Sequence, residues 1–489
     1  MSPTLSDFTG LFSRPQLLSL IGLFWGTFAN AQIHQYRVAL DDKLREAQVE
    51  ICFDGQPADY LMADYKKATR NLIEFPQVSR VKEHGHIEFQ GRFWKTSQLP
   101  HNACINYRVD ISRHLSRKRA QSQQSPLINF QSDNTWLWLP ENFDKGESAE
   151  IEFILPPDMQ ISTPWKRLDQ SKQRYLIGKT PHDWGFTFIV GNFDSMALPV
   201  SGGGQLNLAL LTGVKNRAEL IRWLVKVAGS LNAYLGGNAF EQLQVILMQS
   251  KRQRKSPVPW GDIRRGGGTG VRFVVSSDLP IESFYQDWTA SHEFSHILLP
   301  KLGQEDRWLS EGLASYLQYL LMAQAGQISE REAWQRLYLG LKRGEEGAQK
   351  LSNKTLNEIA DGSAYRGGSA AIMRIYWSGA AYFLLADWQL RQASDNRQGL
   401  PQVLLKLAAC CRESPQIWDG KMLSGKLDQI AGSSIFSKLY QEIAFSEEFP
   451  DFRQALSGLG VEVDSDGVEL VAGDKGKIRR AILSPSGFD

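Results

Sequence analysis

Apolar and polar side chains alternate in short runs from residue 32 to about residue 200. A period of two places every second side chain on one face, as in a β-strand that buries one side. Gly, Pro and Asn separate the runs and are typical of turns. We therefore predict an antiparallel β domain over residues 32–200. Its clearest strands are His34–Leu40, Gln48–Phe53, His86–Phe89, Ala149–Leu155 and Trp184–Gly191.

A helical period replaces the alternation after the glycine-rich stretch Ser201–Gly204, where we place the domain boundary. In Asn216–Leu235 apolar residues recur every three or four positions, which indicates a helix with one buried face. Asn216 is expected as its N-cap and Gly236 as its end.

Two apolar runs, Gln242–Met248 and Gly270–Val275, predict strands that follow this helix. Beyond Tyr316 the pattern is mainly helical as far as about Phe449. Residues 451–489 contain several glycines and indicate a small tail with short strands. The pattern as a whole predicts an α+β protein with its β part first and its helical part last.

Residues 1–31 predict a targeting segment rather than part of the fold. The apolar run Leu17–Phe28 precedes Ala-Asn-Ala, the pattern of a secretory signal that is cleaved after Ala31. This run is short for a membrane span, and no later run of 18 apolar residues occurs. We expect an exported protein, periplasmic or secreted, without a membrane span. An uncleaved anchor is the alternative.

The amino-acid composition excludes few classes of partner. The chain has 489 residues, 22% of them charged, and a net charge of +2, so we expect no nucleic-acid partner. The basic run Lys251–Lys255 favours a solvated loop, with a role toward acidic substrates left open. The oligomeric state is not visible in the sequence.

The four cysteines fall into two pairs. Cys52 and Cys104 lie in strand-like stretches of one region, and we expect an exported chain to join them in a disulfide. Cys410 and Cys411 are neighbours in an apolar helical stretch, and we expect two buried thiols there.

Residues 292–296 read His-Glu-Phe-Ser-His. Residues four apart lie on one face of a helix, so His292 and His296 can bind one metal ion. Glu293 leans toward the same place and can take a proton from a water there. Outside this motif the stretch from Trp288 to Leu298 carries no charge, so the helix can be buried. The pattern predicts a Zn²⁺ site.

A catalytic zinc ion usually has three protein ligands and one open position. Pro300 is expected to end the first helix, and the polar residues Lys301–Arg307 connect it to a second. Ser310 can cap that second helix, which places Glu311 in its first turn. We predict Glu311 as the third ligand; a glutamate that only stabilises a helix start is the alternative.

The glycine run before Gly270–Val275 is not a phosphate loop, because a strand follows it and no Gly-Lys-Ser/Thr occurs. An edge strand beside a zinc helix can pair its backbone with an extended peptide. Gly267, Gly268 and Thr269 are therefore candidates for substrate binding, and a flexible turn is the alternative.

The chain resembles the gluzincin metallopeptidases over about residues 218–460, most closely the glycyl aminopeptidases and more distantly the alanyl aminopeptidases. The blocks that carry the resemblance are His292-Glu293-x-x-His296, Trp308–Gly312 and Tyr376–Ala380. The resemblance implies Zn²⁺ held by the two histidines and Glu311. It also implies that Glu293 is the general base and that Tyr376 donates to the oxyanion. On its own, Tyr376 is a packing aromatic.

Two departures from the family are visible. Such aminopeptidases hold the α-amine of the substrate with an acidic residue beside the glycine-rich edge strand, whereas Gly266–Val271 contains no Glu. Four residues after the ligand glutamate, thermolysin-like enzymes have Asp and this chain has Ser315.

Together these observations predict a thermolysin-like catalytic domain at residues 201–330, with a small mixed sheet and helices. A helical part follows at 331–450 and a tail at 451–489. The expected function is an exported zinc-dependent metallopeptidase, with aminopeptidase activity as the finer implication of the resemblance. A zinc-stabilised binding or scaffold protein and a hydrolase for a non-peptide substrate are the alternatives.

Overall fold

A computed structural model describes residues 32–80, 86–90, 92–112, 128–141, 143, 147–169, 172–178, 185–252, 255–265, 268–361, 368–465 and 467–484. The predicted targeting segment at residues 1–31 and the candidate Gly267 lie outside the described residues.

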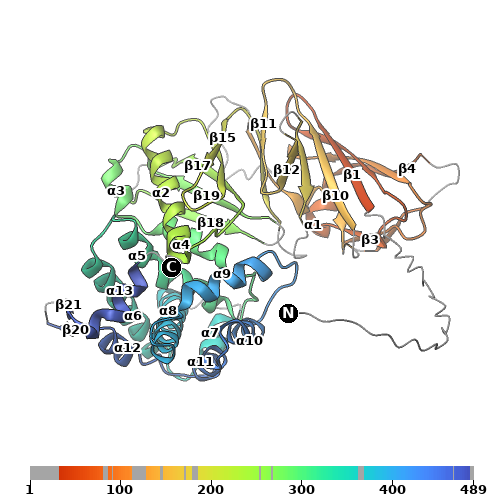
Figure 1. Ribbon diagram of the computed structural model, residues 1–489. Coiled ribbons are helices and arrows are strands. Elements are labelled where there is room, and N and C mark those ends of the chain that lie inside the picture. The colour runs from red at the N-terminus through yellow and green to blue at the C-terminus, as the bar shows by residue number, and fades with distance from the viewer. Residues whose placement is uncertain are drawn as a thin grey trace, which may run out of the picture.

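Seven strands form the largest N-terminal sheet, in the spatial order β12-β13-β10-β1-β2-β7-β4 (Figure 1). Every second side chain of β1, β2, β7 and β10 is buried, as a period of two predicts. The strands are β1 (Gln32–Leu40), β2 (Glu46–Cys52), β4 (Leu72–Ser79), β7 (Cys104–Asp110), β10 (Glu147–Ile154), β12 (Lys166–Asp169) and β13 (Arg174–Ile177).

Two smaller sheets, in the orders β5-β6-β3-β9 and β11-β14-β8, complete the described N-terminal part. The strands are β3 (Tyr60–Met62), β5 (Glu88–Gln90), β6 (Phe93–Lys95), β8 (Ile128–Ser132), β9 (Leu139–Pro140), β11 (Gln160–Ser162) and β14 (Thr187–Gly191). Two short helical elements lie between them, α1 (Tyr65–Asn71) and η2 (Asp133–Thr135).

The N-terminal pairing differs from the prediction in one respect. Most described pairs are antiparallel, but β1 and β10 pair in parallel, with Gln32 opposite Glu147. Alternation shows which face of a strand is buried, but not which strand will lie beside it or in which direction.

A five-stranded mixed sheet, in the order β15-β16-β17-β19-β18, joins the N-terminal part to the helices (Figure 1). Its strands are β15 (Asp194–Pro199), β16 (Gln205–Leu210), β17 (Gln242–Gln249), β18 (Trp260–Arg264) and β19 (Gly270–Val275). The parallel strands β16 and β17 are connected by helix α2 (Arg217–Leu235), which ends at Gly236 in the left-handed conformation. The stretch Ser201–Gly204, where we predict the domain boundary, lies in the connection between β15 and β16, which pair in one sheet.

Helices make up most of the rest of the described chain. They are α3 (Ile281–Tyr285), α4 (Thr289–Ser295), η3 (His296–Leu298), α5 (Arg307–Gln324), α6 (Glu330–Gln349), α7 (Leu356–Ala360), α8 (Gly368–Ala393), α9 (Leu400–Cys411), α10 (Gly420–Ala431), α11 (Ile435–Ala444), α12 (Arg453–Gly458), η4 (Asp474–Gly476) and α13 (Lys477–Leu483). Taken with the sheets, they confirm the α+β class. None of the described helices is long and apolar enough to cross a membrane.

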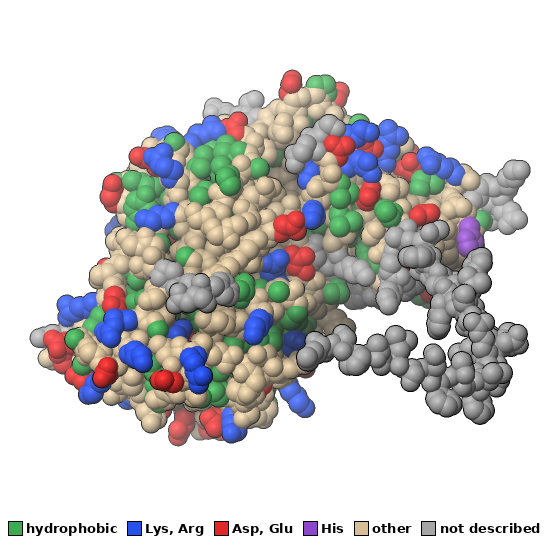
Figure 2. Space-filling view, in the orientation of Figure 1, with side chains coloured by type: hydrophobic (Ala, Val, Ile, Leu, Met, Phe, Trp, Pro, Cys, Tyr) green, Lys and Arg blue, Asp and Glu red, His purple; other side chains and the backbone are tan. Residues whose placement is uncertain are grey.

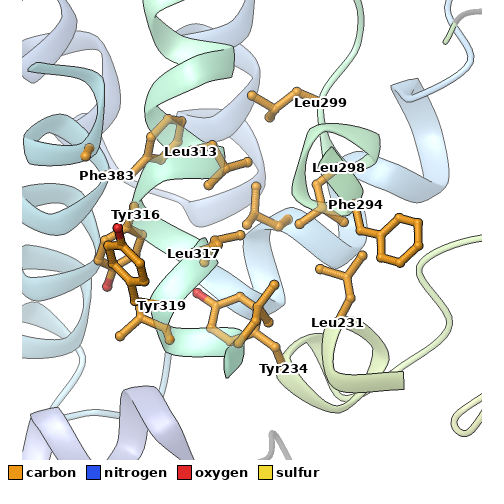
Figure 3. Close-up of a cluster of buried hydrophobic side chains, with 14 of the residues drawn as sticks. Leu231, Tyr234, Phe294, Leu298, Leu299, Leu313, Tyr316, Leu317, Tyr319 and Phe383 are labelled. Atoms are coloured by element: carbon orange, nitrogen blue, oxygen red, sulfur yellow. The ribbon is translucent and has the colours of Figure 1, made fainter. Parts of the chain in front are cut away.

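One apolar core surrounds α5 and includes side chains from α2, α4 and α8 (Figure 3). The labelled members of this cluster are Leu231, Tyr234, Phe294, Leu298, Leu299, Leu313, Tyr316, Leu317, Tyr319 and Phe383. Helix α5 is buried on nearly all sides, because 14 of its 18 residues are buried. A helix in this position has little freedom to move, so it can hold side chains in a fixed place.

Helices α5 and α8 lie close together at two glycines, Gly312 and Gly379. A Cβ atom on Gly312 would overlap the backbone of Gly379, and one on Gly379 would overlap the carbonyl oxygen of Trp308. Absence of both side chains therefore permits this close crossing.

The predicted tail contains the expected short strands, β20 (Val461–Asp464) and β21 (Gly467–Leu470). The tail also contacts the helical part. The buried guanidinium of Arg479 donates from Nε to the carboxylate of Glu330 on α6 at 2.8 Å. The tail thus packs against the helical part.

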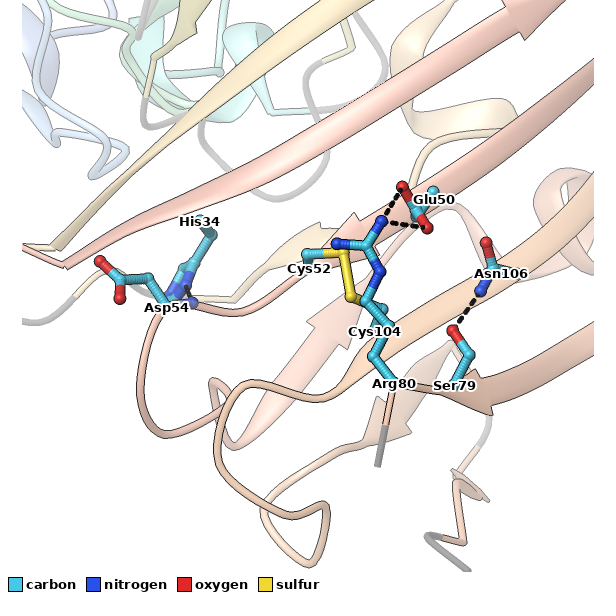
Figure 4. Close-up of a disulfide and its surroundings, with 8 residues drawn as sticks. All are labelled: His34, Glu50, Cys52, Asp54, Ser79, Arg80, Cys104 and Asn106. Atoms are coloured by element: carbon cyan, nitrogen blue, oxygen red, sulfur yellow. Dashed lines mark hydrogen bonds and ion pairs between the residues drawn. A yellow bond between two sulfur atoms is a disulfide. The ribbon is translucent and has the colours of Figure 1, made fainter. Parts of the chain in front are cut away.

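The two cysteine pairs have different outcomes. A disulfide joins Cys52 on β2 to Cys104 on the neighbouring β7, as expected (Figure 4). Cys410 and Cys411 are also joined in a disulfide rather than being two thiols, and Cys410 is exposed rather than buried. The expectation of burial was wrong because the pair lies where α9 ends, at its solvent-facing side.

Candidate active site

Helix α4 and the turn η3 carry the predicted metal motif. His292 and Glu293 lie in α4, and His296 is the first residue of η3. The chain becomes extended at Leu299, immediately before Pro300, so the helix ends where the sequence predicts.

The three predicted ligands converge. Nε2 of His292 lies 3.3 Å from Oε2 of Glu311, and Nε2 of His296 lies 3.6 Å from the same oxygen. In a tetrahedral zinc site with bonds of about 2.0–2.2 Å, ligand atoms lie about 3.3–3.6 Å apart. The residue types and their separations therefore fit Zn²⁺.

The second nitrogen of each imidazole is also occupied. Nδ1 of His292 lies 2.9 Å from Oε1 of Gln318, and Nδ1 of His296 lies 3.0 Å from Oγ of Ser310. With an Nδ1–H donating to these oxygens, each Nε2 keeps its lone pair for a metal. Both partners belong to α5, as Glu311 does, so one helix supplies a ligand and orients the other two.

The start of α5 differs from the prediction. The helix begins at Arg307 with Asp306 as its N-cap, so Ser310 lies within the helix and Glu311 is its fifth residue. The buried carboxylate of Asp306 accepts hydrogen bonds from Tyr440 Oη at 3.0 Å and from the backbone N–H of Gly420 at 2.7 Å. The side chain of Asp306 makes no capping hydrogen bond to α5 and instead ties the start of the helix to distant residues, contacts that cannot be inferred from local sequence.

Arg265 supports the His296 side of the site. Its Nη2 donates to Oγ of Ser310 at 2.8 Å, and only 6% of the residue is exposed. Burial lowers the pKa of Arg265 to about 10, although the charges of Glu311 and Glu293 oppose this. A guanidinium with that pKa is charged at neutral pH. Sequence analysis did not identify Arg265, Gln318 or the role of Ser310.

Glu293 lies close to the edge strand β18. A Cβ atom on Gly261 would be 2.8 Å from Cγ of Glu293, so the glycine leaves room for this side chain. Burial raises the pKa of Glu293 to about 7, with His292 opposing the rise. A carboxylate with a pKa near neutrality can both accept and return a proton.

Two of the three predicted ligands, His296 and Glu311, are in the form that binds a cation. Burial lowers the pKa of the third, His292, but its hydrogen bond to Glu311 and the charge of that carboxylate raise it overall. Burial lowers the pKa of His296 to about 4. Burial alone would raise the pKa of Glu311, but the neighbouring His296 and His292 bring it well below its usual range. At neutral pH, therefore, His296 is neutral and Glu311 is ionised, which are the forms that bind metal.

Tyr376 comes from α8, far along the chain. Its ring lies parallel to the imidazole of His292, with a centroid distance of 5.8 Å and an angle of 9°. It also lines the same cavity as the three ligands. The structure thus brings Tyr376 to the site where the resemblance implies it.

A cavity of about 850 Å³ opens onto these residues. Its walls are strand β18, the ligand helices, the connection between them, Tyr376 and the segment before α10. The strand that follows the glycine run is β19, which lies between β17 and β18 and is therefore not an edge strand. The edge strand at the cavity is β18. Gly268 and Thr269 are not brought to the cavity; a Cβ on Gly268 would instead lie 3.0 Å from the carbonyl oxygen of Pro164.

Solved structures of an aminopeptidase N family protein and of M1 zinc metallopeptidases share this fold at low sequence identity. One is an aminopeptidase N family protein from Idiomarina loihiensis, with a TM-score of 0.62 and 16% identity over 90% of this chain and 82% of that one. Another is an M1 zinc metallopeptidase mutant from Deinococcus radiodurans bound to a Tyr-Ser-Ala substrate, with a TM-score of 0.54 and 11% identity over 86% of this chain and 96% of that one. No protein-family model and no curated protein matches the sequence.

Proposed function

We propose that the protein is a zinc-dependent metallopeptidase. The observation that carries this proposal is the convergence of His292, His296 and Glu311 beside Glu293 at the wall of one cavity. When bound, Zn²⁺ supplies a Lewis acid that polarises the scissile carbonyl and lowers the pKa of water.

The other steps of the proposed reaction depend on protein side chains. Glu293 accepts a proton from the attacking water and passes it to the leaving amine, a task suited to its raised pKa. The hydroxyl of Tyr376 donates a hydrogen bond to the oxyanion that forms from the carbonyl. Gln318 and Ser310 hold the imidazoles in the orientation and tautomer that the metal needs.

Peptides are the proposed substrates. Two solved structures of this fold hold Tyr-Ser-Ala and L-tryptophan, which are a peptide and an amino acid. Strand β18 supports this choice, because it is an edge strand of its sheet at the cavity and can pair with an extended backbone.

Export is part of the proposal. Its support is the apolar run with Ala-Asn-Ala in residues 1–31 and the disulfide between Cys52 and Cys104, which is typical of oxidising compartments. We place the protein in the periplasm or outside the cell.

Glu293→Gln tests the proposed chemistry. The amide cannot accept the proton, so kcat on peptides should fall by about 10²–10⁴-fold while zinc content stays the same. Peptide hydrolysis and metal content are measured on the same sample. Glu305→Gln, at an exposed position between the ligand helices, is the matched control.

Two outcomes would replace the proposal. If the purified protein binds zinc and cleaves no peptide in a diverse library, the peptidase proposal is wrong, and the scaffold and the hydrolase for a non-peptide substrate are the alternatives that replace it. If Glu293→Gln retains full activity, Glu293 is not the general base.

A further inference from the structure

The cavity beside the ligands carries an excess of positive charge. Two carboxylates of its lining, Glu293 and Glu311, face the proposed Zn²⁺, and their two negative charges offset the charge of that ion. Four cationic residues and one carboxylate remain among the described lining residues, which gives a net charge of +3 (4 − 1). These residues are Arg264, Arg265, Lys301, Arg307 and Asp262.

This excess belongs to the cavity rather than to the molecule. The whole chain has a net charge of only +2, and basic and acidic side chains are interspersed on the face seen in Figure 2. Within a cleft, low-dielectric walls concentrate the field of such charges, so the local potential exceeds what the net charge suggests.

The one carboxylate is already engaged. Oδ1 and Oδ2 of Asp262 accept hydrogen bonds from Nε and Nη2 of Arg272 at 3.2 and 3.3 Å, and Oδ2 lies 3.8 Å from Nε of Arg264. Asp262 is therefore surrounded by cations and is poorly suited to hold the ammonium group of a substrate.

Arg265 adds a positive charge with a fixed position to the wall of the cavity. It is buried, lines the cavity and donates from Nη2 to Oγ of Ser310 at 2.8 Å. A buried charge of this kind acts more strongly on a nearby anion than an exposed one does.

We propose that this cleft selects peptides with a carboxylate close to the scissile bond, either an acidic side chain or the peptide's own C-terminal group. The proposal rests on the peptidase function proposed above. Arg264 on β18 and Arg307 at the start of α5 both line the cavity and are half-buried. Arg307 donates from Nε to the carbonyl oxygen of Gln304 at 3.2 Å, which holds its guanidinium in place. Both can therefore act as specificity-determining residues. The same field repels an ammonium group, which makes lysine at that position unfavourable.

Three matched peptide series test the proposal with the zinc-loaded protein. The series have Glu, Gln or Lys beside the scissile bond, each with a free or an amidated C-terminus. We expect kcat/KM to be about tenfold higher for Glu than for Gln, as a charge-assisted hydrogen bond provides, and lower for Lys than for Gln. Comparison of free with amidated peptides shows which carboxylate is recognised.

Binding provides a second readout that does not require turnover. The same peptides are titrated calorimetrically into zinc-loaded Glu293→Gln protein at low and high salt, because screening should weaken only the charged series. The variant Arg264→Gln/Arg307→Gln should lower the Glu-to-Gln preference about tenfold in both assays. Arg222→Gln, an exposed arginine on α2 outside the cavity, should leave the preference unchanged.

The outcomes separate the two proposals. Cleavage or binding without preference for Glu, or with preference for Lys, overturns the acidic specificity and leaves the peptidase intact. Absence of cleavage with intact preference in binding rejects the peptidase function and keeps the anionic specificity. If the double variant unfolds, the Glu-to-Gln preference is measured on the single variant Arg264→Gln instead.

Discussion

At the scale of single residues, the two hydrogen bonds behind the imidazoles deserve a direct test. Ser310→Ala and Gln318→Leu each remove the acceptor of one Nδ1–H, so the ring loses its orientation and fixed tautomer. We expect each change to weaken zinc binding by about 10–100-fold. The measurement is competition with a chelator of known affinity.

A control for this prediction lies on the same helix. Gln324, at the end of α5, is a glutamine remote from both histidines, so Gln324→Leu should leave zinc affinity unchanged. Equal affinity of wild type, Ser310→Ala and Gln318→Leu would show that these side chains only pack.

The sequence predicted the residues whose chemistry follows a fixed spacing. His292 and His296 lie four apart on one helix, and the short connection leaves few positions for a third ligand, so Glu311 could be inferred. Gln318 and Arg265 could not, because their contacts depend on how α5 and β18 pack, and neither residue stands in a recognisable pattern. The period of α5 could have suggested Gln318, since it lies seven residues after Glu311 and so on the same face.

At the scale of elements, the close crossing of α5 and α8 links the ligand Glu311 to Tyr376. Gly379→Ala would place a Cβ against the carbonyl oxygen of Trp308 and push the two helices apart. We expect a loss of about 1–3 kcal/mol in the free energy of unfolding, as for other overpacked contacts, together with reduced kcat. Urea unfolding and peptide hydrolysis measure the two effects.

Ala380→Gly is the matching change at the next position. It removes a methyl group at a fully buried site without adding bulk, so it should cost stability without displacing α8. If Gly379→Ala is as stable and active as wild type, the crossing is not as tight as described.

The edge strand β18 could not be predicted from the sequence. Trp260–Arg264 contains one strongly apolar aliphatic residue, Ile263, between charged ones, so its pattern does not predict a strand. It becomes a strand because β19 offers a complete row of backbone groups beside it. Longer elements such as α2 and β17 were predicted well, because their apolar periods repeat several times.

At the scale of the whole molecule, export and the N-terminal disulfide are linked. We expect the exported chain to begin at Gln32 and to have lost four hydrogens, two at Cys52 and Cys104 and two at Cys410 and Cys411, which intact-mass measurement detects. Cys52→Ser/Cys104→Ser removes a cross-link across 52 residues, so the free energy of unfolding should fall by about 4 kcal/mol on the chain-entropy account.

Zinc content is the internal control for that variant, because the ligands lie in another part of the molecule and should be unaffected. An exported chain that retains residues 1–31 would contradict cleavage and favour the anchor. An unchanged unfolding free energy would show that the disulfide contributes no stability.

The parallel pairing of β1 with β10 has a consequence for the order of events during synthesis. Gln32 meets Glu147, which is 115 positions later (147 − 32), and β1 lies inside its sheet between β2 and β10. Strand β1 therefore lacks one of its two neighbouring strands until more than a hundred further residues have been synthesised. Contacts between residues so far apart in sequence form slowly, so we expect the amino-terminal sheet to form late in folding. Until β10 pairs with β1, the free edge of β1 is exposed and prone to aggregation.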